Sequence, residues 1–358
     1  MKIKYEIIGL MSGTSLDGLD IAHVAFDRDE PNTMNYNVIH TAHYPYNEKI
    51  LEKLLNLNSL STTGILILDK EIGKFYAECV NGFISNFDIS KNQISAIASH
   101  GQTIFHQPQH GFTYQIGCGS TLAFHTNIPV INDFRTKDII AGGQGAPLVP
   151  IGDFDLFKKE AEGFLNIGGF SNVSYKNDKD IIAFDCCPGN LPLNKLASSK
   201  GIPFDAEGKL AASGTLNFFL LDLLNSIDFY SFKGPKSLGT EWLEEKFYPL
   251  LKFDKEIENN LRTVVEHISI QISNVLNDAK LNSVLVTGGG AKNTFLIERI
   301  SHYFKGKLIV PDEQIIDFKE AIIFAYLGAL YLEGKPNNIA SVTGASRHVA
   351  GGVYHIPG

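Results

Sequence analysis

The sequence predicts an α/β protein that folds as two lobes. Its 358 residues exceed what a single hydrophobic core usually organises, so two lobes are the default expectation. Runs typical of strands alternate with runs typical of helices, which favours mixed sheets covered by helices. A strand, a turn of small residues and a second strand are predicted from residue 6, and the same pattern starts again at residue 163.

The first lobe begins with two predicted strands, residues 6–10 and 21–26, on either side of a glycine-rich turn. Residues 51–60 and 63–87 follow as predicted helices. In the second of these helices, apolar residues recur every three or four positions, which is the period of an amphipathic helix. Residues 94–98 form a short apolar run that predicts a buried strand.

The second lobe opens with residues 163–175, which predict a strand, a turn and a strand. Residues 283–286 predict another strand, which enters the triple glycine 288–290, and residues 293–303 predict the helix that follows. Such a turn lets a nucleotide approach the backbone at a helix N-terminus, although a tight strand-to-helix connection has the same composition. The apolar stretch 321–332 is too short to span a bilayer and is typical of a buried helix.

Composition argues against several functional classes. The formal net charge of -8 and the lack of a basic cluster argue against a nucleic-acid partner. Residues 1–6 lack the features of a secretory signal, so we expect a cytoplasmic protein with no membrane partner. The cysteines show no C-x-x-C spacing that would suggest zinc, and we expect reduced, mostly buried thiols at Cys79, Cys118, Cys186 and Cys187.

The most informative segment is the turn within residues 9–20, which reads G-L-M-S-G-T-S-L-D-G-L-D. Gly13 and Gly18 allow backbone conformations that other residues avoid, so main-chain N–H groups can turn toward an anion. Thr14 and Ser15 add hydroxyl donors. This combination suits the phosphate tail of a nucleotide. An ordinary turn is the alternative, because turns favour Gly, Ser and Asp for conformational reasons alone.

Two acidic residues of this segment are candidate metal ligands. Asp17 or Asp20 could hold the Mg²⁺ that accompanies ATP, either directly or through water. Mg²⁺ prefers oxygen ligands and keeps several of its waters when a protein binds it. The segment therefore predicts a site for the phosphates of ATP together with their magnesium ion.

The same segment resembles the N-terminal signature of the bacterial anhydro-N-acetylmuramic acid kinases. Seven further strings along the chain resemble that family. Each is a weak signal by itself, but their shared order makes the set specific. The strings are H-G-Q-T at 100–103, D-F-R at 133–135, A-G-G-Q-G-A-P-L-V-P at 141–150, N-I-G-G-F-S-N at 166–172, T-G-G-G at 287–290, E-A-I-I-F-A at 320–325 and V-T-G-A at 342–345.

The resemblance implies the two-lobed α/β fold of actin, sugar kinases and the Hsp70 ATPase, with a cleft between the lobes. We expect residues 1–133, completed by 338–358, to form the first lobe and residues 134–337 to form the second. The family reaction uses ATP to open the anhydro bridge of a cell-wall amino sugar, adding water at C1 and a phosphoryl group at O6. The resemblance also implies a homodimer.

Asp185 matches the catalytic aspartate of the family. A carboxylate is needed to activate the attacking water, and burial can tune its pKa for that task. The alternative is that Asp185 caps a helix that begins near Asn190.

The resemblance assigns the remaining site residues to two ligands. The expected ATP contacts are Gly13, Thr14, Ser15, Leu16, Asp17, Gly18, Leu19, Asp20, Gly168, Gly169, Asn172, Gly288, Gly289 and Gly290, with Asp17 and Asp20 at the metal. The expected sugar contacts are Gln102, Arg135, Gly189, Asn190 and Glu320.

Several of these roles have competing explanations. Arg135 is the candidate partner of the lactyl carboxylate of the sugar, because a guanidinium can bind a carboxylate with two hydrogen bonds. Lys236 is its competitor, and an internal salt bridge from Arg135 to Asp133 or Asp138 is the structural alternative. Glu320 is expected to open a helix, where it could also stabilise the helix dipole. His100 is expected to be a structural donor, and the loop that contains it is expected to present Gln102 to the substrate.

The sequence departs from the family pattern in the predicted substrate lobe. Residues 185–190 read D-C-C-P-G-N where the family usually has D-T-G-P-G-N, so Cys187 replaces a glycine. Asn194 stands where an acidic residue is common, and Thr240 stands where an arginine is usual. The main hypothesis is a working kinase. The alternatives are a kinase for a related sugar and an ATP-binding sugar sensor without turnover.

Overall fold

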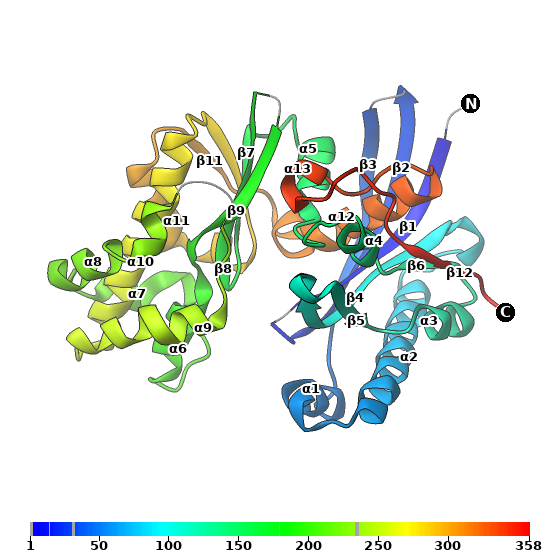
Figure 1. Ribbon diagram of the computed structural model, residues 1–358, viewed down its shortest axis with the longest axis horizontal. Coiled ribbons are helices and arrows are strands. Elements are labelled where there is room, and N and C mark those ends of the chain that lie inside the picture. The colour runs from blue at the N-terminus through cyan, green and yellow to red at the C-terminus, as the bar shows by residue number, and fades with distance from the viewer. Residues whose placement is uncertain (1–2, 14, 31–32, 179, 233–235) are drawn as a thin grey trace. The chain divides into compact units, whose positions relative to one another are not determined.

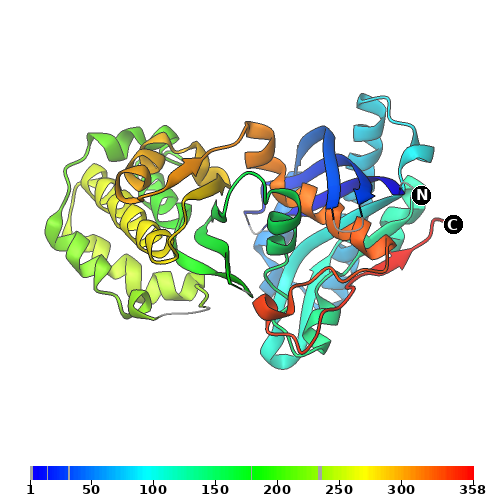
Figure 2. The same cartoon turned by 90° about the horizontal axis from the view of Figure 1, so that it is seen from above.

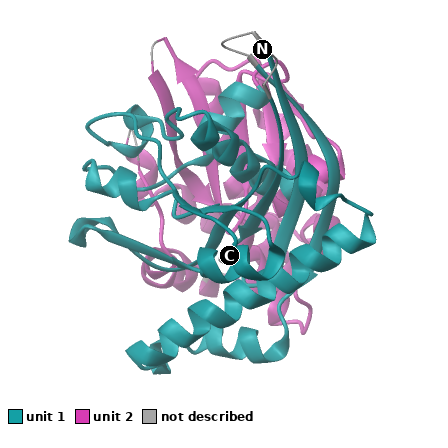
Figure 3. Cartoon of the chain, turned by 90° about the vertical axis from the view of Figure 1, so that its right-hand side faces the viewer, with its two compact units in different colours: residues 1–157, 318–358 teal, residues 158–317 magenta. Residues whose placement is uncertain are grey.

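The computed structural model describes residues 3–13, 15–30, 33–178, 180–232 and 236–358. The chain forms two compact units, which Figure 3 shows in different colours. Unit 1 contains residues 1–157 and 318–358, and unit 2 contains residues 158–317. Each unit has its own sheet and its own hydrophobic core.

Unit 1 is built on a mixed sheet with the strand order β12-β6-β4-β1-β2-β3, and β5 pairs with β4. Strands β1, β2 and β3 are antiparallel neighbours, while β4 runs parallel to β1 and to β6 (Figure 1). The strands are β1 (Ile3–Ser12), β2 (Gly18–Glu30), β3 (Thr33–Pro45), β4 (Ala96–Gln107), β5 (Phe112–Ile116), β6 (Val130–Asn132) and β12 (Val353–His355).

Helices cover both faces of this sheet because the side chains of β1 alternate between them. Ile8 and Leu10 enter the core beneath α2. Gly9 lies on the other face against α12, where a Cβ would come within 2.8 Å of the backbone nitrogen of Ala325. Only glycine allows this close helix packing. The helices are α1 (Glu48–Leu55), α2 (Thr62–Asn86), α3 (Gly119–Thr126), α4 (Thr136–Ile140), α5 (Val149–Leu156), α12 (Glu313–Leu332), of which residues 318–332 belong to unit 1, and α13 (Ala340–Thr343).

Unit 2 has a five-stranded sheet with the order β11-β10-β7-β8-β9. Its strands are β7 (Gly163–Ile167), β8 (Phe170–Asn177), β9 (Asp180–Pro188), β10 (Ser283–Thr287) and β11 (Lys307–Ile309). Helix α10, drawn in yellow among the other helices of this unit in Figure 2, supplies many buried residues of the core. The helices are α6 (Asn190–Ser198), α7 (Lys209–Ser213), α8 (Phe218–Asn225), α9 (Thr240–Trp242), α10 (Ile257–Asp278) and α11 (Thr294–Tyr303).

The two sheets repeat one topology. In each unit, three consecutive strands pair antiparallel, and two later strands extend the sheet in parallel from the first strand of the unit. The repeat gives β3-β2-β1-β4-β6 in unit 1 and β9-β8-β7-β10-β11 in unit 2. This duplicated order is the arrangement expected for the actin, sugar-kinase and Hsp70 ATPase fold, and it confirms the predicted fold class.

The unit boundaries differ from the expected ones, which followed residues 133 and 337. Residues 134–157 and 318–337 group with unit 1 instead. Helix α5 is held to α12 there, because Lys319 Nζ lies 3.0 Å from Asp153 Oδ1 and the Tyr326 hydroxyl donates to Asp155 at 2.6 Å. These contacts join two segments that are far apart in the sequence, which is why the sequence did not indicate them.

Local predictions were more accurate than the boundaries. The second predicted helix is confirmed as α2, whose N-cap Ser61 accepts a hydrogen bond from Gly64 N. The first predicted helix lies earlier than expected, because Asn47 caps α1 and the helix ends at Leu55. Strand β4 continues to Gln107, so the expected loop around Gln102 is strand. In the described part of the chain, no helix is long and apolar enough to cross a membrane.

Candidate active site

The first glycine turn, residues 13–17, connects β1 to β2. Thr14 lies outside the described residues. Leu16 has a φ of 57°, and Ser15 Oγ donates to Asp17 Oδ1 at 2.8 Å. Gly18 has a φ of 156° and lies against the backbone of Tyr44, so a side chain would be excluded there. The turn therefore exposes a hydroxyl and a carboxylate on a backbone that residues with a Cβ adopt only with strain.

The side chain of Gln102 anchors the start of this turn at Gly13. Its Nε2 donates to the Gly13 carbonyl at 3.1 Å. Its Oε1 accepts hydrogen bonds from Ser12 Oγ at 2.5 Å and from the Tyr46 hydroxyl at 3.2 Å. Gln102 is almost completely buried. The expectation that Gln102 contacts the sugar is therefore revised, because its polar atoms are already used to anchor the first glycine turn.

Two predicted ATP contacts at the start of β2, Leu19 and Asp20, differ in what their side chains can do. Leu19 is fully buried in the core beneath α2, so only its backbone is available to a ligand. Asp20 Oδ1 accepts a hydrogen bond from His43 Nδ1 at 2.7 Å. Among the described residues, no group of three or more His, Cys, Asp or Glu side chains could hold a metal ion. Any magnesium bound by Asp17 or Asp20 would depend on the phosphates and waters that accompany it.

Arg135 belongs to a network in unit 1 rather than to a salt bridge. Its Nη1 donates to the Gly145 carbonyl at 2.7 Å. Its Nε and Nη2 lie 3.1 Å and 2.8 Å from His100 Nε2. Burial, followed by the charge of Arg135, lowers the pKa of His100 to about 3, so the imidazole stays neutral and Nε2 can accept. His100 is thus an acceptor toward Arg135, which corrects the expectation of a structural donor.

Glu320 carries a carboxylate that makes no hydrogen bond to any other described residue. It is the eighth residue of α12, so the expectation that it opens a helix is wrong. Asp312 performs the capping role instead and accepts from Ile315 N at 2.9 Å. Burial raises the pKa of Glu320, and the charges of Lys319 and Arg135 oppose that rise. An unbonded carboxyl group can bind a hydroxyl, as an acceptor in its ionised form and as a donor in its protonated form.

In unit 2, the second glycine turn, Gly168-Gly169, is held by the backbone at the start of α6. The N–H groups of Gly189 and Asn190 donate to the carbonyls of Gly169 and Gly168, both at 2.8 Å. A Cβ on Gly189 would collide with the Gly168 carbonyl. The close approach of the two segments therefore requires glycine at residue 189.

The triple glycine 288–290 follows β10 and lies at the same end of the unit 2 sheet as Gly168-Gly169, which follows β7. Gly288 has a φ of 80°, and a Cβ on it would lie 2.8 Å from the Ile167 carbonyl at the end of β7. Gly289 is exposed and lies near Asn190 Nδ2. Because β7 and β10 are parallel neighbours, their carboxyl ends bring these glycine segments together. This edge of unit 2 can admit a ligand close to the backbone.

Asp185 lies on β9, opposite Asn172 of β8. Its Oδ2 accepts a hydrogen bond from Leu238 N at 2.9 Å, and Oδ1 makes none to the rest of the described chain. Burial raises the pKa of Asp185, and the bond from Leu238 opposes part of that rise. The N-cap of α6 is Gly189, so the structure contradicts the alternative that Asp185 caps this helix.

The two adjacent cysteines are buried because β9 contains a bulge. Ser171 pairs with Cys187 and Asn172 pairs with Asp185, which leaves Cys186 as the extra residue. Both thiols enter the core of unit 2, and burial raises the pKa of each. Neither residue has a positive φ. The Cβ that replaces the usual glycine therefore points into the core, away from the exposed side of the strand.

Comparison with known proteins identifies the family. The model of the anhydro-N-acetylmuramic acid kinase family matches residues 5–356. A curated relative of that name from Shewanella pealeana is 37% identical, and the match covers 97% of this chain and 98% of the relative. One from Haemophilus influenzae is also 37% identical, over 98% of this chain and 97% of the relative. The chain belongs to the anhydro-N-acetylmuramic acid kinase family.

The similar solved structures share little sequence identity with this chain. The activator of a 2-hydroxyisocaproyl-CoA dehydratase from Clostridium difficile is 12% identical, with a TM-score of 0.45, over 92% of this chain and 97% of the activator. A ROK hexokinase from Thermus thermophilus is 15% identical, with a TM-score of 0.39, over 92% and 99%.

The competing cation Lys236 and the two remaining departures from the family pattern, Asn194 and Thr240, all lie in unit 2. Lys236 Nζ donates to the carbonyls of Phe229 and Phe232 and lies 4.2 Å from the centre of the Phe229 ring. This makes Lys236 a weaker candidate than Arg135 for a ligand carboxylate. Asn194 and Thr240 are both exposed.

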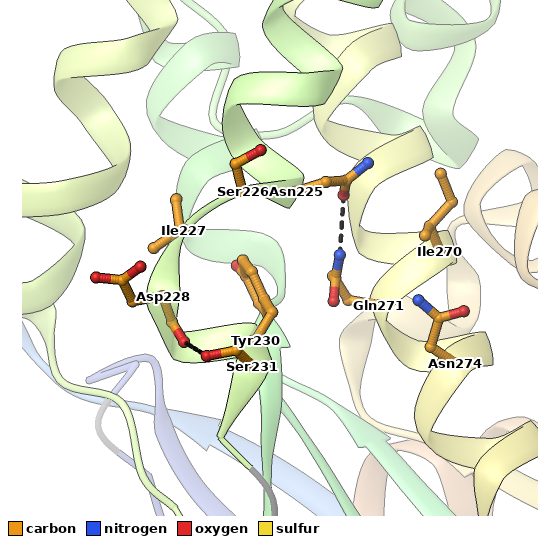
Figure 4. Close-up of a pocket in the computed structure, with 9 residues that line it drawn as sticks. All are labelled: Asn225, Ser226, Ile227, Asp228, Tyr230, Ser231, Ile270, Gln271 and Asn274. Carbon is orange, nitrogen blue, oxygen red and sulfur yellow. Dashed lines mark hydrogen bonds between the residues drawn. The ribbon is translucent and has the colours of Figure 1, made fainter.

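A separate surface pocket of unit 2, shown in Figure 4, has a volume of about 520 Å³. It lies where the end of α8 meets α10, and Gln271 Nε2 donates to Asn225 Oδ1 at its edge. Within the described chain, the residues that line it include no lysine, no arginine and none of the predicted site residues. The pocket therefore lacks the cations that a phosphate or a sugar carboxylate would require.

Sequence reasoning missed several residues that shape the predicted site. Tyr46 and Ser12 support Gln102, and Leu238 N fixes Asp185. Gly145 supplies the carbonyl that holds Arg135. Gly145 lies within the family string A-G-G-Q-G-A-P, so a signal was present, but only the fold shows which side chain it serves.

Proposed function

We propose that this chain is an ATP-dependent kinase that acts on 1,6-anhydro-N-acetylmuramic acid during cell-wall recycling. The observation that carries the proposal is the family match along residues 5–356, together with full-length relatives of that name. As a family member the chain is a carbohydrate kinase. In the proposed reaction, water adds at C1, the bridge to O6 opens, and O6 takes the γ-phosphoryl group. The products are N-acetylmuramic acid 6-phosphate and ADP.

Asp185 is the proposed general base. Its Oδ2 is held by Leu238 N, which leaves Oδ1 to accept a proton from the attacking water. Burial raises the pKa of Asp185, and a carboxylate with a raised pKa is a stronger base than an ordinary aspartate. The exposed Asn172 on the opposite strand is a candidate contact for the phosphates.

Arg135 and Glu320 are the proposed sugar contacts in unit 1. An arginine has five N–H donors, and His100 and Gly145 use three of those on Arg135. The two that remain are as many as a bidentate carboxylate requires. The lactyl carboxylate of the sugar is the proposed partner. Glu320 would accept or donate a hydrogen bond to a sugar hydroxyl, and Gly189 and Asn190 of unit 2 stay candidate sugar contacts.

The glycine segments are the proposed nucleotide contacts. The first glycine turn would bind the phosphates of ATP, with Asp17 or Asp20 at magnesium, and Gly168-Gly169 and residues 288–290 would bind other parts of the nucleotide. Magnesium would neutralise phosphate charge as the phosphoryl group moves. A homodimer and a cytoplasmic location are finer proposals that rest on the family resemblance, and size-exclusion chromatography with light scattering would test the dimer.

Product analysis tests the function. The chain is incubated with ATP, magnesium and 1,6-anhydro-N-acetylmuramic acid, and the products are identified by mass spectrometry and phosphorus NMR in ¹⁸O-labelled water. A ring-opened phosphate that has gained one labelled oxygen supports the proposal. A phosphate ester with the bridge intact would indicate a kinase for a related sugar. No product, with ATP still bound, would support the sensor hypothesis.

A further inference from the structure

Asp138 is a buried carboxylate that the proposed reaction leaves unused. It lies in α4, three residues after Arg135, and its side chain is fully buried. Its Oδ2 accepts a hydrogen bond from Gly145 N at 2.7 Å. Its Oδ1 accepts from Asn338 Nδ2 at 2.5 Å and from Thr343 Oγ1 at 2.7 Å. A buried carboxylate with three donors is a firm structural anchor, because charge-assisted hydrogen bonds are the strong ones.

Gly145 connects this anchor to Arg135. The N–H of Gly145 donates to Asp138, and the carbonyl of the same residue accepts from Arg135 Nη1. Gly145 has a φ of 68°, a conformation that favours glycine. The N–H and the carbonyl of Gly145 belong to adjacent peptide planes that meet at its Cα, so the bond to Asp138 restrains the plane from which the carbonyl extends through the φ and ψ of Gly145 alone. Burial lowers the pKa of Arg135 to about 10, and the charges of Glu320 and then of Asp138 oppose that fall.

The C-terminal segment, residues 337–346, supplies the two donors to Asp138 Oδ1, which are Asn338 and Thr343. Thr343 belongs to α13, and its carbonyl accepts from Gln144 N at 2.7 Å. Ser346 N donates to the Ala141 carbonyl at 2.8 Å. This segment therefore contacts the loop 141–147 at Ala141 and Gln144, and it reaches Asp138 through the side chains of Asn338 and Thr343.

We propose that Asp138 is a positioning residue for sugar recognition, which holds the Gly145 carbonyl against Arg135 and couples the C-terminal segment to binding of the sugar carboxylate. The inference rests on the proposed function, because it assumes that Arg135 binds the lactyl group. Arg135 is held on one edge by His100 and on the other by Gly145. Loosening Gly145 would let the two free N–H groups turn away from the direction that a carboxylate needs.

Asp138→Asn is the first test. Asparagine keeps the shape but has one acceptor oxygen, so its NH₂ group must face a donor and at least one anchor bond is lost. The dissociation constant for the lactyl-bearing sugar should rise roughly tenfold or more, as expected for a lost bond to a charged group. Affinities for ATP and for the sugar analogue without the lactyl group should change less than twofold. Equal losses for both sugars would overturn the proposal.

A double-mutant cycle tests whether Asp138 acts through Arg135. On an Arg135→Ala background, Asp138→Asn should cause no further loss of affinity for the lactyl-bearing sugar. Full additivity would overturn the proposal. If wild type binds ATP but neither sugar, the proposed function fails instead, so the two failures are distinguishable.

The C-terminal segment offers a matched pair of controls. Asn337 and Asn338 are neighbouring buried residues, but only Asn338 reaches Asp138, whereas Asn337 bonds to Gly351 and to the Leu327 carbonyl. Asn338→Leu should impair binding of the lactyl-bearing sugar selectively, and Asn337→Leu should not. Equal effects of the two would contradict the coupling.

A more conservative pair of substitutions at Thr343 tests the proposal if Asn337→Leu, Asn338→Leu or Asp138→Asn fails to fold. Thr343→Val removes the hydroxyl donor with little change of volume, and Thr343→Ser keeps the donor. Valine should weaken binding of the lactyl-bearing sugar by a few-fold, and serine should restore it. Identical affinities for both variants would overturn the proposal. Isothermal titration measures each affinity, and thermal melting confirms that each variant is folded.

Discussion

The β1–β2 turn of unit 1 and the β7–β8 turn of unit 2 occupy equivalent places in two sheets of the same strand order, but they are held in different ways. Side chains hold the first turn: Gln102 bonds to the Gly13 carbonyl, and Ser15 bonds to Asp17. Backbone groups hold the second turn, because N–H groups at the start of α6 donate to Gly168 and Gly169.

The difference shows how one topology can supply two kinds of binding surface. A turn held by side chains can be altered one hydrogen bond at a time, and in unit 1 it lies within a set of buried polar groups. A turn held by close backbone contact depends on glycine, because any Cβ would force the segments apart. We therefore expect substitutions in unit 1 to change ligand affinity, and substitutions at the glycines of unit 2 to change stability as well.

The largest expected effect is at Asp185, and it would show that unit 2 supplies the base. Asp185→Asn keeps the shape and the bond from Leu238 but removes proton acceptance. Turnover should fall by roughly 10²–10⁴, the usual contribution of a general base. Steady-state kinetics measures this, and ATP affinity should change little.

Asp180→Asn is a suitable control for Asp185→Asn, because Asp180 is an exposed aspartate at the other end of the same strand. Its turnover should match that of wild type. Undiminished turnover of Asp185→Asn would show that Asp185 is not the base.

The next effect tests whether the second glycine turn depends on close backbone contact. Gly189→Ala places a Cβ against the Gly168 carbonyl and within 3.1 Å of Ser171 Oγ. The free energy of unfolding should fall by about 1–3 kcal/mol, as for other overpacked sites. Gly82→Ala is the control, because nothing lies within 4 Å of a Cβ there and the residue is inside helix α2. That variant should gain roughly 0.5–1 kcal/mol. Equal stability of the two variants in urea melts would break the comparison.

A smaller effect is expected where a side chain holds the first turn. Gln102→Leu removes the bond to Gly13 and the oxygen that accepts from Ser12 and Tyr46, whose hydroxyls then keep only each other and Tyr76 as partners. The KM for ATP should rise roughly tenfold, the cost of about one lost hydrogen bond in a buried site, and the KM for the sugar should not change. Gln115→Leu on β5 is the control, because Gln115 bonds to Thr113 instead. A rise in the KM for the sugar alone would restore Gln102 as a substrate contact.

Much of the fold followed from local patterns. Apolar runs on either side of small-residue turns predicted both antiparallel hairpins, and helical spacing predicted α2 almost to the residue. The unit boundaries could not be predicted in this way. They depend on α12 approaching β1 at Gly9, a contact between residues more than 300 positions apart that leaves no periodic signal.

The site was less predictable, because its roles depend on partners far away in the sequence. Asp138 was expected only as a salt-bridge partner of Arg135, although its oxygens bond to Gly145, Asn338 and Thr343. Buried thiols were expected at Cys186 and Cys187, but the reason both are buried was not: regular alternation would place neighbouring residues on opposite faces, and a bulge at Cys186 changes the face of the next residue. The residue types were predicted, but which residues pair with one another was not.

The smallest expected effect is the pH dependence of stability, and it sharpens the contrast between Asp185 and a well-bonded aspartate. Burial raises the pKa of Asp185 above its ordinary value, so between the two values the folded state holds more protons than the unfolded state, and stability falls as pH rises. Asp185→Asn should therefore match wild type near pH 3 and become more stable than wild type toward neutral pH. The pKa of Asp254 is shifted in the opposite direction, below its ordinary value. Its own burial is outweighed by hydrogen bonds from Asn217 and Glu256, which lower its pKa, so Asp254→Asn should be less stable than wild type at neutral pH. Thermal melts of the three proteins from pH 3 to pH 7 measure both differences. Parallel curves for all three would mean that neither carboxylate is perturbed in the folded state.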